Sequence, residues 1–349
     1  MISLCLAIET SCDDTSVALV EADGQVRALV SANQDLAHAP FGGIVPEIAC
    51  RNHSLNLLPL IEQVFKKSNI SWEQVGGIVV TNRPGLIGSL IVGIVTAKSL
   101  AQARKLPLIG VNHLEGHILA PFLKDESYQP TFPYEKPFLA LAISGGHTSL
   151  YHVKSFGDYH ILGATLDDAA GEAFDKFGKM AGLGFPGGVK VDQLSKNGNV
   201  KAYDFPRSMI KEDNYLMSFS GLKASAQRLL ESLGPEKVQA NLADLCASFQ
   251  EAIVDILIAK LDRAAGKTGI RNIVITGGVS ANSRLRERAQ AWAAKNQLNL
   301  LIPPLRYCTD NAAMIGYAGI LRFNRGEHSS LDLGPSPNSY PQDFFGEGR

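Results

Sequence analysis

Two histidines stand four residues apart in the segment HLEGH at residues 113–117. On a helix, this spacing places the imidazoles of His113 and His117 on one face, where they can hold a single metal ion. The segment follows an apolar run that ends at Val111, and ligands of α/β proteins gather beyond the carboxyl ends of such strands. Two unrelated histidines are the alternative. Leu114 stands where zinc peptidases carry their catalytic glutamate, which disfavours a metalloprotease.

A carboxylate that can complete a metal site lies near the end of the chain. Asp310 belongs to the segment CTDN at residues 308–311, which opens the last expected helix. Two imidazoles and one carboxylate are a common donor set for divalent metals. An aspartate at the start of a helix more usually caps it, so both roles stay open for Asp310.

Two Gly-Gly turns follow apolar runs and can approach a ligand closely. The segment ISGGHT at 143–148 turns from one expected strand into the next, and GGVSAN at 277–282 leads from a strand into a helix. Backbone N–H groups of such turns can bind a phosphate or another anion. An ordinary hairpin and an ordinary strand–helix connection, with Ser280 as the helix cap, are the alternatives.

An acidic segment at residues 167–176 places Asp168, Glu172 and Asp175 on one face of an expected helix. These side chains form either a solvated acidic stripe or a set of carboxylates that grips the hydroxyl groups of a ligand. The turn FPGG at 185–188 and then Asp192 follow closely along the chain.

Strand and helix patterns alternate along the chain, which indicates an α/β fold. A polar, proline-rich segment at 125–136 separates two halves, and each half opens with a strand, a tight polar turn and a returning strand. We expect lobes at 1–124 and 137–328, a loosely held tail at 329–349, and both turns at a cleft between the lobes. Strands are expected at 3–9, 17–20, 26–31, 77–81, 106–111, 138–143, 149–153 and 272–276, and helices at 47–67, 86–104, 113–123, 168–183, 221–232, 237–265, 280–295 and 309–325.

Two of these helices have informative faces. The helix at 47–67 is expected to group its apolar side chains on one face, formed by Leu55, Leu58, Ile61 and Phe65. The helix at 86–104 is rich in glycine and alanine, so we expect it to be buried.

The composition is that of a globular protein that is long enough to fold without disulfide or metal cross-links. The chain has 349 residues, of which 45% are hydrophobic and 19% charged, so disorder is excluded for most of it. Five scattered cysteines without a CxxC pair make a disulfide framework improbable and fit a reducing cytosol. The N-terminal segment lacks the basic start of a signal peptide, and no apolar run is long enough to span a membrane.

The charge is distributed unevenly although the whole chain carries a net charge of only −1. Residues 1–62 hold eight acids and two bases, a net charge of −6. Residues 263–306 hold eight bases and one acid, a net charge of +7. This basic window is either a solvated helix face or a surface for a polyanion.

Seven segments, in this order, resemble the tRNA threonylcarbamoyladenosine transferase family: IETSCDDT (8–15), HLEGH, ISGGHT, DDAAGEAFDK (167–176), SFSGLK (218–223), GGVSAN and CTDNAAM (308–314). The resemblance covers about residues 4–325. It implies the architecture of the actin, sugar-kinase and heat-shock-ATPase superfamily, with two ribonuclease-H-like lobes and a nucleotide cleft between them.

The resemblance implies a specific reaction. A partner enzyme makes threonylcarbamoyl-adenylate, and members of this family pass the threonylcarbamoyl group to the exocyclic amine of adenosine 37, beside the anticodon of tRNAs that read codons starting with A. AMP is released. Bacterial relatives work with a fold-related scaffold paralogue and a small ATPase, and the helices at 47–67 and 86–104 are candidates for the partner-facing surface.

The resemblance also assigns roles to individual residues. It implies one divalent metal on His113, His117 and Asp310, with Fe(II) favoured and Zn(II) as the alternative. It implies that the phosphate and acyl part of the adenylate are contacted by Ile143, Ser144, Gly145, Gly146 and His147. Its ribose and adenine are implied to be held by Asp175, Gly188, Asp192 and Asn282.

Two departures and three alternatives accompany this assignment. Arg83 replaces a glycine of the family pattern, and the tail lacks the Arg-Pro ending common in relatives. A kinase on the same fold needs no histidine pair, and a non-catalytic scaffold paralogue lacks the metal motif. An endopeptidase, an older label for the family, is disfavoured because Glu115 is misplaced for a catalytic base. We therefore expect the catalytic transferase.

Overall fold

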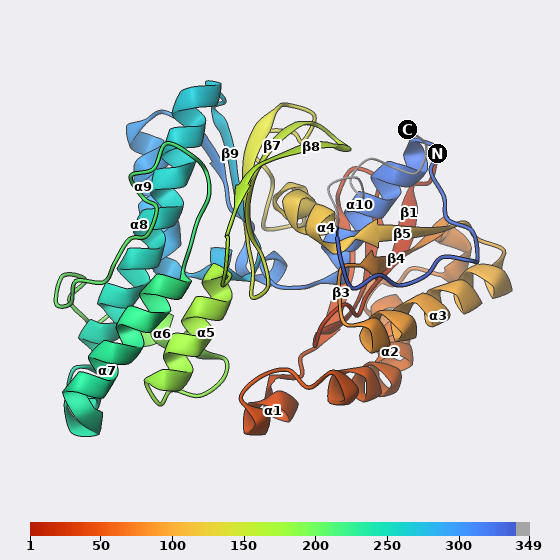
Figure 1. Cartoon of the computed structure of the whole chain (residues 1–349). Helices are drawn as coiled ribbons and strands as arrows, with labels where there is room; N and C mark the ends of the chain where they lie inside the picture. Colours follow the sequence, from red (N-terminus) through yellow and green to blue (C-terminus); the bar gives the residue numbers. More distant parts are fainter. Residues whose placement is uncertain (340–349) are drawn as a thin grey trace. The chain divides into compact units, whose positions relative to one another are not determined.

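The computed structural model describes residues 1–339 and divides into two compact units. One unit comprises Met1–Tyr134 and the chain from Pro303 onward, and the other comprises Glu135–Ile302. Each unit is built on a five-stranded sheet with helices packed against it (Figure 1). The expected α/β fold class with two sheet-based lobes is confirmed.

The first sheet has the strand order β3-β2-β1-β4-β5. The three N-terminal strands are antiparallel neighbours, whereas β4 runs parallel to β1 and β5 parallel to β4. The carboxyl ends of β1, β4 and β5 therefore share one edge of the sheet. The strands are β1 (Leu4–Glu9), β2 (Thr15–Glu21), β3 (Val26–Ala32), β4 (Gly77–Arg83) and β5 (Leu108–Asn112).

Helices cover both faces of this sheet because its central strands are buried on both sides. On one face, α2 and α3 pack against each other (Figure 1). They cover a core of leucine, isoleucine and valine side chains. On the other face, α10 packs against β1, β2 and β4 and also contacts α4. The helices are α1 (Asp35–His38), α2 (Pro46–Ser68), α3 (Ile87–Arg104), α4 (His113–Leu119) and α10 (Ala312–Asn324).

The position of α10 corrects the expected division, which assigned residues up to 328 to the second lobe. The helix lies on the first sheet, and its glycines face strand side chains there. A Cβ on Gly316 would come within 3.0 Å of Ala7 Cβ, and a Cβ on Gly319 would come within 2.2 Å of Val79 Cγ1. The backbone of α10 thus approaches the strands more closely than a larger residue would allow.

The described part of the tail is also bound to the first unit rather than loosely held. The Ser329 N–H donates to the Leu108 carbonyl at 2.8 Å, and the Ser336 N–H donates to the Asn82 carbonyl at 2.9 Å. The amide of Asn112 donates to Ser339 Oγ at 2.7 Å. Residues 329–339 therefore lie beside β5 and the carboxyl end of β4. Residues 340–349 lie outside the described part of the chain.

Two expectations about helix faces are partly wrong. In α2, Ile61 is buried as expected, but Leu55 and Leu58 are 66% and 62% exposed. In α3, one face is buried, whereas Ile91 and Val95 on the other face are exposed. Both helices are apolar on more than one side, so the sheet covers only part of their apolar surface.

The second sheet repeats the first, with the strand order β8-β7-β6-β9-β10 and β9 parallel to β6. Its core lies between the sheet and the helices of the same unit. The strands are β6 (Phe138–Ile143), β7 (Thr148–Ser155), β8 (Asp158–Ala164), β9 (Asn272–Thr276) and β10 (Asn299–Leu301). The helices are α5 (Ala170–Met180), α6 (Gly187–Ser195), α7 (Ser220–Ala240), α8 (Leu242–Thr268) and α9 (Ser283–Lys295). Within residues 1–339, none of the helices combines the length and the apolar character needed to cross a membrane.

Candidate metal centre and binding loops

The two histidines of HLEGH lie on α4, which begins where β5 ends. The side chain of Asn112 caps the helix by accepting a hydrogen bond from the Leu114 N–H at 2.9 Å. One helical turn separates His113 from His117, so their rings meet edge to face with centroids 4.6 Å apart. Both side chains are buried, as befits groups held in a fixed orientation.

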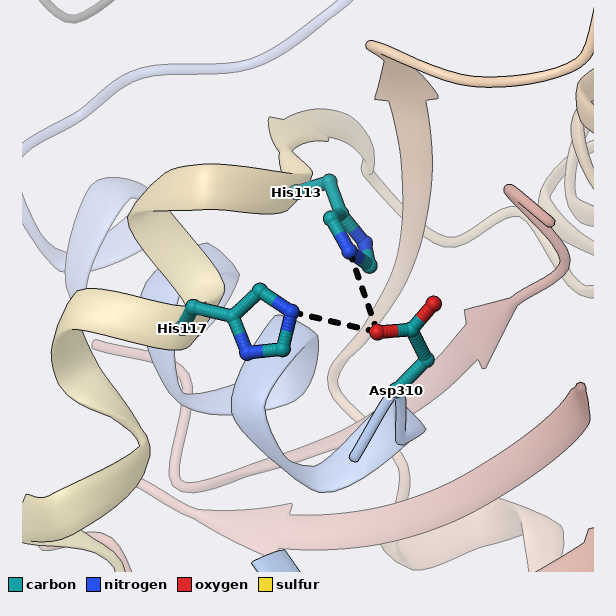
Figure 2. A group of neighbouring side chains, drawn as sticks. All are labelled: His113, His117 and Asp310. Carbon is teal, nitrogen blue, oxygen red and sulfur yellow. Dashed lines mark hydrogen bonds and ion pairs between the residues drawn. The ribbon is translucent and has the colours of Figure 1, made fainter. Parts of the chain in front are cut away.

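Asp310 reaches both imidazoles from the segment before α10. Its neighbour Asn311 caps α10 by accepting from the Met314 N–H, so the Asp310 carboxylate is not used as the cap. Asp310 Oδ1 lies 3.1 Å from His117 Nε2 and 3.3 Å from His113 Nε2 (Figure 2). One ligand atom from each of the three side chains lies within 4.8 Å of the others. The structure thus brings together the three residues that the sequence singled out.

Further carboxylates surround this group. Glu9, at the end of β1, is fully buried, and its Oε2 atom lies 3.1 Å from His113 Nδ1. Ser11 Oγ lies 3.1 Å from the same nitrogen. Glu9 is not among the site residues predicted from the sequence. The available signal was a charged residue at the end of an otherwise apolar strand, beside the polar turn of the first motif.

The electrostatics of the group favour a positive charge at its centre. Burial would raise the pKa of Asp310, but the facing His113 and His117 hold it well below its usual value. Burial would lower the pKa of His113, but Asp310 and Glu9 raise it well above its usual value. At the same sheet edge, burial and the nearby charges of Asp310 and Asp13 raise the pKa of Asp14 to about 8. The carboxylates gathered at this edge of the sheet therefore favour a cation among them.

The donor set fits a divalent transition metal. Two imidazole nitrogens and one carboxylate oxygen converge, and this combination suits Zn(II) and Fe(II) better than Mg(II) or Ca(II), which prefer oxygen ligands. With these three protein ligands, a bound metal would keep a coordination position for a substrate, as catalytic rather than structural sites do.

In the second unit, the segment 143–148 forms the tight turn between β6 and β7. The Ser144 N–H donates to the His147 carbonyl at 2.8 Å, and the His147 N–H donates to Ser144 Oγ at 3.1 Å. Gly145 and Gly146 are exposed, and a Cβ on either would meet no atom within 4 Å. Packing within the chain therefore does not demand glycine here, and the space above the turn is open to a ligand.

Two other elements meet this turn. A Cβ on Gly171, at the start of α5, would lie 2.6 Å from the Ser144 carbonyl oxygen. A Cβ on Gly277, just after β9, would lie 2.4 Å from the Ile143 carbonyl oxygen. Because β6 and β9 are parallel neighbours, both Gly-Gly turns of the sequence analysis lie at the carboxyl edge of one sheet.

The remaining expected binding residues hold the neighbouring helices in place. Asp175 Oδ1 accepts hydrogen bonds from the N–H groups of Gly187 and Gly188, at 2.8 and 3.0 Å, and so caps α6. Asp192 Oδ1 accepts from the N–H and hydroxyl of Ser283, at the start of α9. Asn282, and not Ser280, caps α9 by accepting from the Leu285 N–H, and its amide donates to Gln250 Oε1 at 2.6 Å. The residues expected to bind adenylate thus lie in one connected set of turns and helix ends.

Comparison with known proteins identifies the family. The family described as TsaD, tRNA N6-adenosine threonylcarbamoyltransferase, matches residues 25–317. A relative of the same name from Bdellovibrio bacteriovorus is 68% identical over 344 residues, which cover 99% of this chain and 100% of the relative. This chain belongs to that family. A second relative of the same name, from Anaeromyxobacter dehalogenans, is 48% identical and covers 95% of this chain and 98% of its own length.

Solved structures support the fold of this transferase-family chain. Full-length HypF in a phosphate- and nucleotide-bound form superposes with a TM-score of 0.58 at 13% identity, covering 93% of this chain and 47% of HypF. HypF from T. kodakarensis superposes with a TM-score of 0.55, also at 13% identity, covering 95% of this chain and 50% of that chain. At this level of identity, the likeness concerns the architecture alone.

The acidic segment of this family member does not place all three carboxylates on one face of a helix, as the sequence predicted. Asp168 precedes α5 and pairs with Lys176 and with Lys223 of α7, both at 2.8 Å. Glu172 also pairs with Lys176. Asp175 instead faces α6, as described above. The carboxylates on this segment therefore serve different contacts, and Asp168 and Glu172 are neutralised by lysines.

The basic window at 263–306 is also largely neutralised. Arg284 donates to both oxygens of Glu251, and Arg288 pairs with Glu251 and Asp255. At least five of its eight bases form ion pairs with carboxylates: Arg263, Lys267, Arg284, Arg288 and Arg306. The expected polyanion surface therefore does not present its formal charge of +7 to solvent.

Proposed function

We propose that this chain transfers the threonylcarbamoyl group of threonylcarbamoyl-adenylate to the N6 amine of the adenosine beside the anticodon in tRNAs that read codons starting with A, and that AMP is released. The observation that carries the proposal is the convergence of His113, His117 and Asp310 in a chain of this transferase family. The acceptor tRNA follows from the names of the relatives.

The reaction needs positioning more than a covalent intermediate. The amine nitrogen attacks the carbamoyl carbon, the bond from that carbon to the phosphate oxygen breaks, and AMP carries away the electron pair. The amine loses one proton to solvent. Since the mixed anhydride is already activated and an aromatic amine is a weak nucleophile, holding both groups in contact supplies much of the rate. No nucleophilic side chain is required.

His113 and His117, through their Nε2 atoms, and Asp310, through Oδ1, would hold one divalent metal, for which we favour Fe(II) over Zn(II). When bound, such a metal can polarise a carbonyl oxygen or anchor substrate oxygens. The buried carboxylate of Glu9 adds negative charge behind this group and so supports a cation there.

The second unit would bind the adenylate. Ile143, Ser144, Gly145, Gly146 and His147 form the open turn, whose backbone N–H groups can bind the phosphate and acyl oxygens. Asp175, Gly188, Asp192 and Asn282 would hold the ribose and adenine. Asp192 supports this role because its Oδ2 atom makes no hydrogen bond within the described part of the chain and can accept one from a ribose hydroxyl.

The exposed apolar face of α2 and α3 would receive a protein partner. Side chains from both helices contribute to it, and the two helices pack side by side. A patch of this kind marks an interaction surface more often than a solvated one. We propose the fold-related scaffold paralogue as its occupant, with the small ATPase joining the assembly. The exposed residues are Leu55, Leu58, Ile87, Ile91 and Val95.

The test is a transfer assay with threonylcarbamoyl-adenylate, unmodified tRNA and the partner proteins, in which modified adenosine is counted by mass spectrometry. The intact chain should form product, and His113→Ala should form little. His160→Ala is the matched control because His160 is exposed and pairs with Asp158 at the surface of the second unit. Product from His113→Ala at the wild-type rate would remove the metal from the proposal. Failure of the intact chain, with partners proven active, would overturn the transferase itself.

A further inference from the structure

Glu9 occupies a buried position in which three hydrogen-bonding groups converge on its carboxylate. Its Oε1 atom accepts from the Ser11 N–H at 2.5 Å. Its Oε2 atom accepts from the Thr81 hydroxyl at 2.5 Å and lies 3.1 Å from His113 Nδ1. The side chain is fully buried, so water does not compete for these contacts. Both oxygens of the Glu9 carboxylate therefore act as hydrogen-bond acceptors.

The two ring nitrogens of His113 have different surroundings. Nδ1 faces Glu9 Oε2, whereas Nε2 faces Asp310 Oδ1 at 3.3 Å. A neutral imidazole carries one proton, and a metal can bind only the nitrogen that lacks it. A carboxylate at Nδ1 accepts a hydrogen bond and so keeps the proton there. The Ser11 hydroxyl, 3.1 Å from the same nitrogen, can donate or accept and therefore does not decide which nitrogen is protonated.

We propose that Glu9 is the positioning residue that holds His113 with its proton on Nδ1 and thereby presents Nε2 to the metal. This inference rests on the proposed metal site. It extends that site by a residue that touches neither metal nor substrate, and it gives a reason for a carboxylate at the end of β1. A carboxylate behind a metal-binding histidine typically fixes the ring and strengthens it as a ligand.

The surroundings make Glu9→Gln a sharp test. The backbone N–H of Ser11 can only donate, so the single oxygen of the new amide must stay at the Oε1 position. The amide nitrogen then takes the Oε2 position and donates toward His113 Nδ1. That nitrogen must now accept, which moves the proton of a neutral ring to Nε2. The substitution therefore preserves size but reverses the preferred tautomer.

Zn²⁺ affinity measured by competition with a chromophoric chelator, together with the visible spectrum of the Co²⁺ form, reports on the site without any substrate. Glu9→Gln should lower Zn²⁺ affinity by about 10–100-fold. Thr81→Val is the matched control, because it removes a buried hydrogen bond to the same Glu9 oxygen and leaves the contact with His113. Thr81→Val and Ser11→Ala should both bind Zn²⁺ close to wild type. Thermal unfolding of each metal-free variant shows whether the fold persists.

The outcomes separate this role from the proposed function. Wild-type Zn²⁺ affinity in Glu9→Gln, or an equal loss in Thr81→Val or Ser11→Ala, overturns the positioning role. In a His113→Ala background, Glu9→Gln should cause no additional loss, and an undiminished loss also overturns it. If His117→Ala binds Zn²⁺ as tightly as wild type, the metal site itself is wrong, and the positioning role fails with it.

Discussion

Glu115 and Arg322 form a buried, bidentate ion pair that links α4 to α10. The Arg322 Nε atom donates to Glu115 Oε2 at 2.7 Å, and Nη2 donates to Oε1 at 2.9 Å. The Glu115 side chain is fully buried and that of Arg322 is 7% exposed. The pair joins the helix that carries both histidines to the helix that follows Asp310. It also explains why Glu115, despite its place in HLEGH, is not a catalytic base, since its carboxylate is committed to the arginine.

Arg322→Met should therefore destabilise the protein strongly, because it removes the arginine that pairs with the buried Glu115 carboxylate. We expect a loss of about 3–5 kcal/mol in the free energy of unfolding, measured with urea. Arg27→Ala is the control, since Arg27 pairs with Glu21 in the same unit but is 47% exposed, and its loss should cost at most about 1 kcal/mol. Equal losses of unfolding free energy in the two variants would show that the buried pair contributes no more than the exposed one.

Gly145 in the 143–148 turn and Gly171, which packs against this turn from the start of α5, should respond differently to alanine. Gly171→Ala places a methyl group 2.6 Å from the Ser144 carbonyl oxygen and should cost about 1–3 kcal/mol of stability. Gly145→Ala meets no atom within 4 Å and should change stability by no more than about 0.5 kcal/mol. It should nevertheless raise the KM for threonylcarbamoyl-adenylate, because the methyl group fills the space left for the ligand. Thermal unfolding and transfer kinetics test both statements, and an unchanged KM for Gly145→Ala would contradict the second.

Much of the fold could be predicted because most strands are apolar runs of ordinary length bounded by turns. Two of the missed elements lack a clear local pattern. β8 is a half-exposed strand that pairs with β7, so its side chains do not form a continuous apolar run. α6 begins with Gly187-Gly188, which indicates a turn, yet Asp175 from α5 supplies the cap that starts the helix. No local pattern reveals a cap donated by another helix.

The candidate metal ligands could be predicted because helical spacing alone places His113 and His117 together. The choice between capping and metal binding for Asp310 could not be made from sequence, since it depends on Asn311 taking the cap. Glu9 was missed because its importance comes from meeting His113 across 104 residues of chain. Likewise, α2 is apolar on more than one side, so periodicity did not reveal that Leu55 and Leu58 face solvent.

Arg284 and Arg288 should contribute to stability rather than to tRNA affinity. Both donate to Glu251, whose side chain is only 9% exposed, so Arg288→Ala should cost about 1–3 kcal/mol of unfolding free energy. Lys295→Ala on the same helix is the control, because Lys295 is exposed and makes no ion pair within residues 1–339. The salt dependence of tRNA binding should be the same for Arg288→Ala and wild type. A slope reduced by about one would instead identify Arg288 as a phosphate contact.

Asp125 should contribute to the free energy of unfolding at neutral pH, and this contribution should be lost in acid. It accepts hydrogen bonds from the Tyr307 hydroxyl at 2.6 Å and from Arg306 Nε at 2.8 Å, and these join the end of the N-terminal segment to the chain that returns from the second unit. Burial would raise the pKa of Asp125, but the hydrogen bonds from Tyr307 and Arg306 hold it well below its usual value. A carboxyl whose pKa is lowered by folding stabilises the protein above its unfolded pKa of about 3.9, and this contribution is lost as the pH falls toward the folded value.

Asp125→Asn should therefore unfold at a lower urea concentration than wild type at pH 7. The gap between the two urea midpoints should narrow steadily below about pH 4. Asp204→Asn is the control, because Asp204 is fully exposed and its pair with Arg207 spans 3.6 Å. A gap between Asp125→Asn and wild type that stays constant with pH would show that the charge of Asp125 does not matter to the fold.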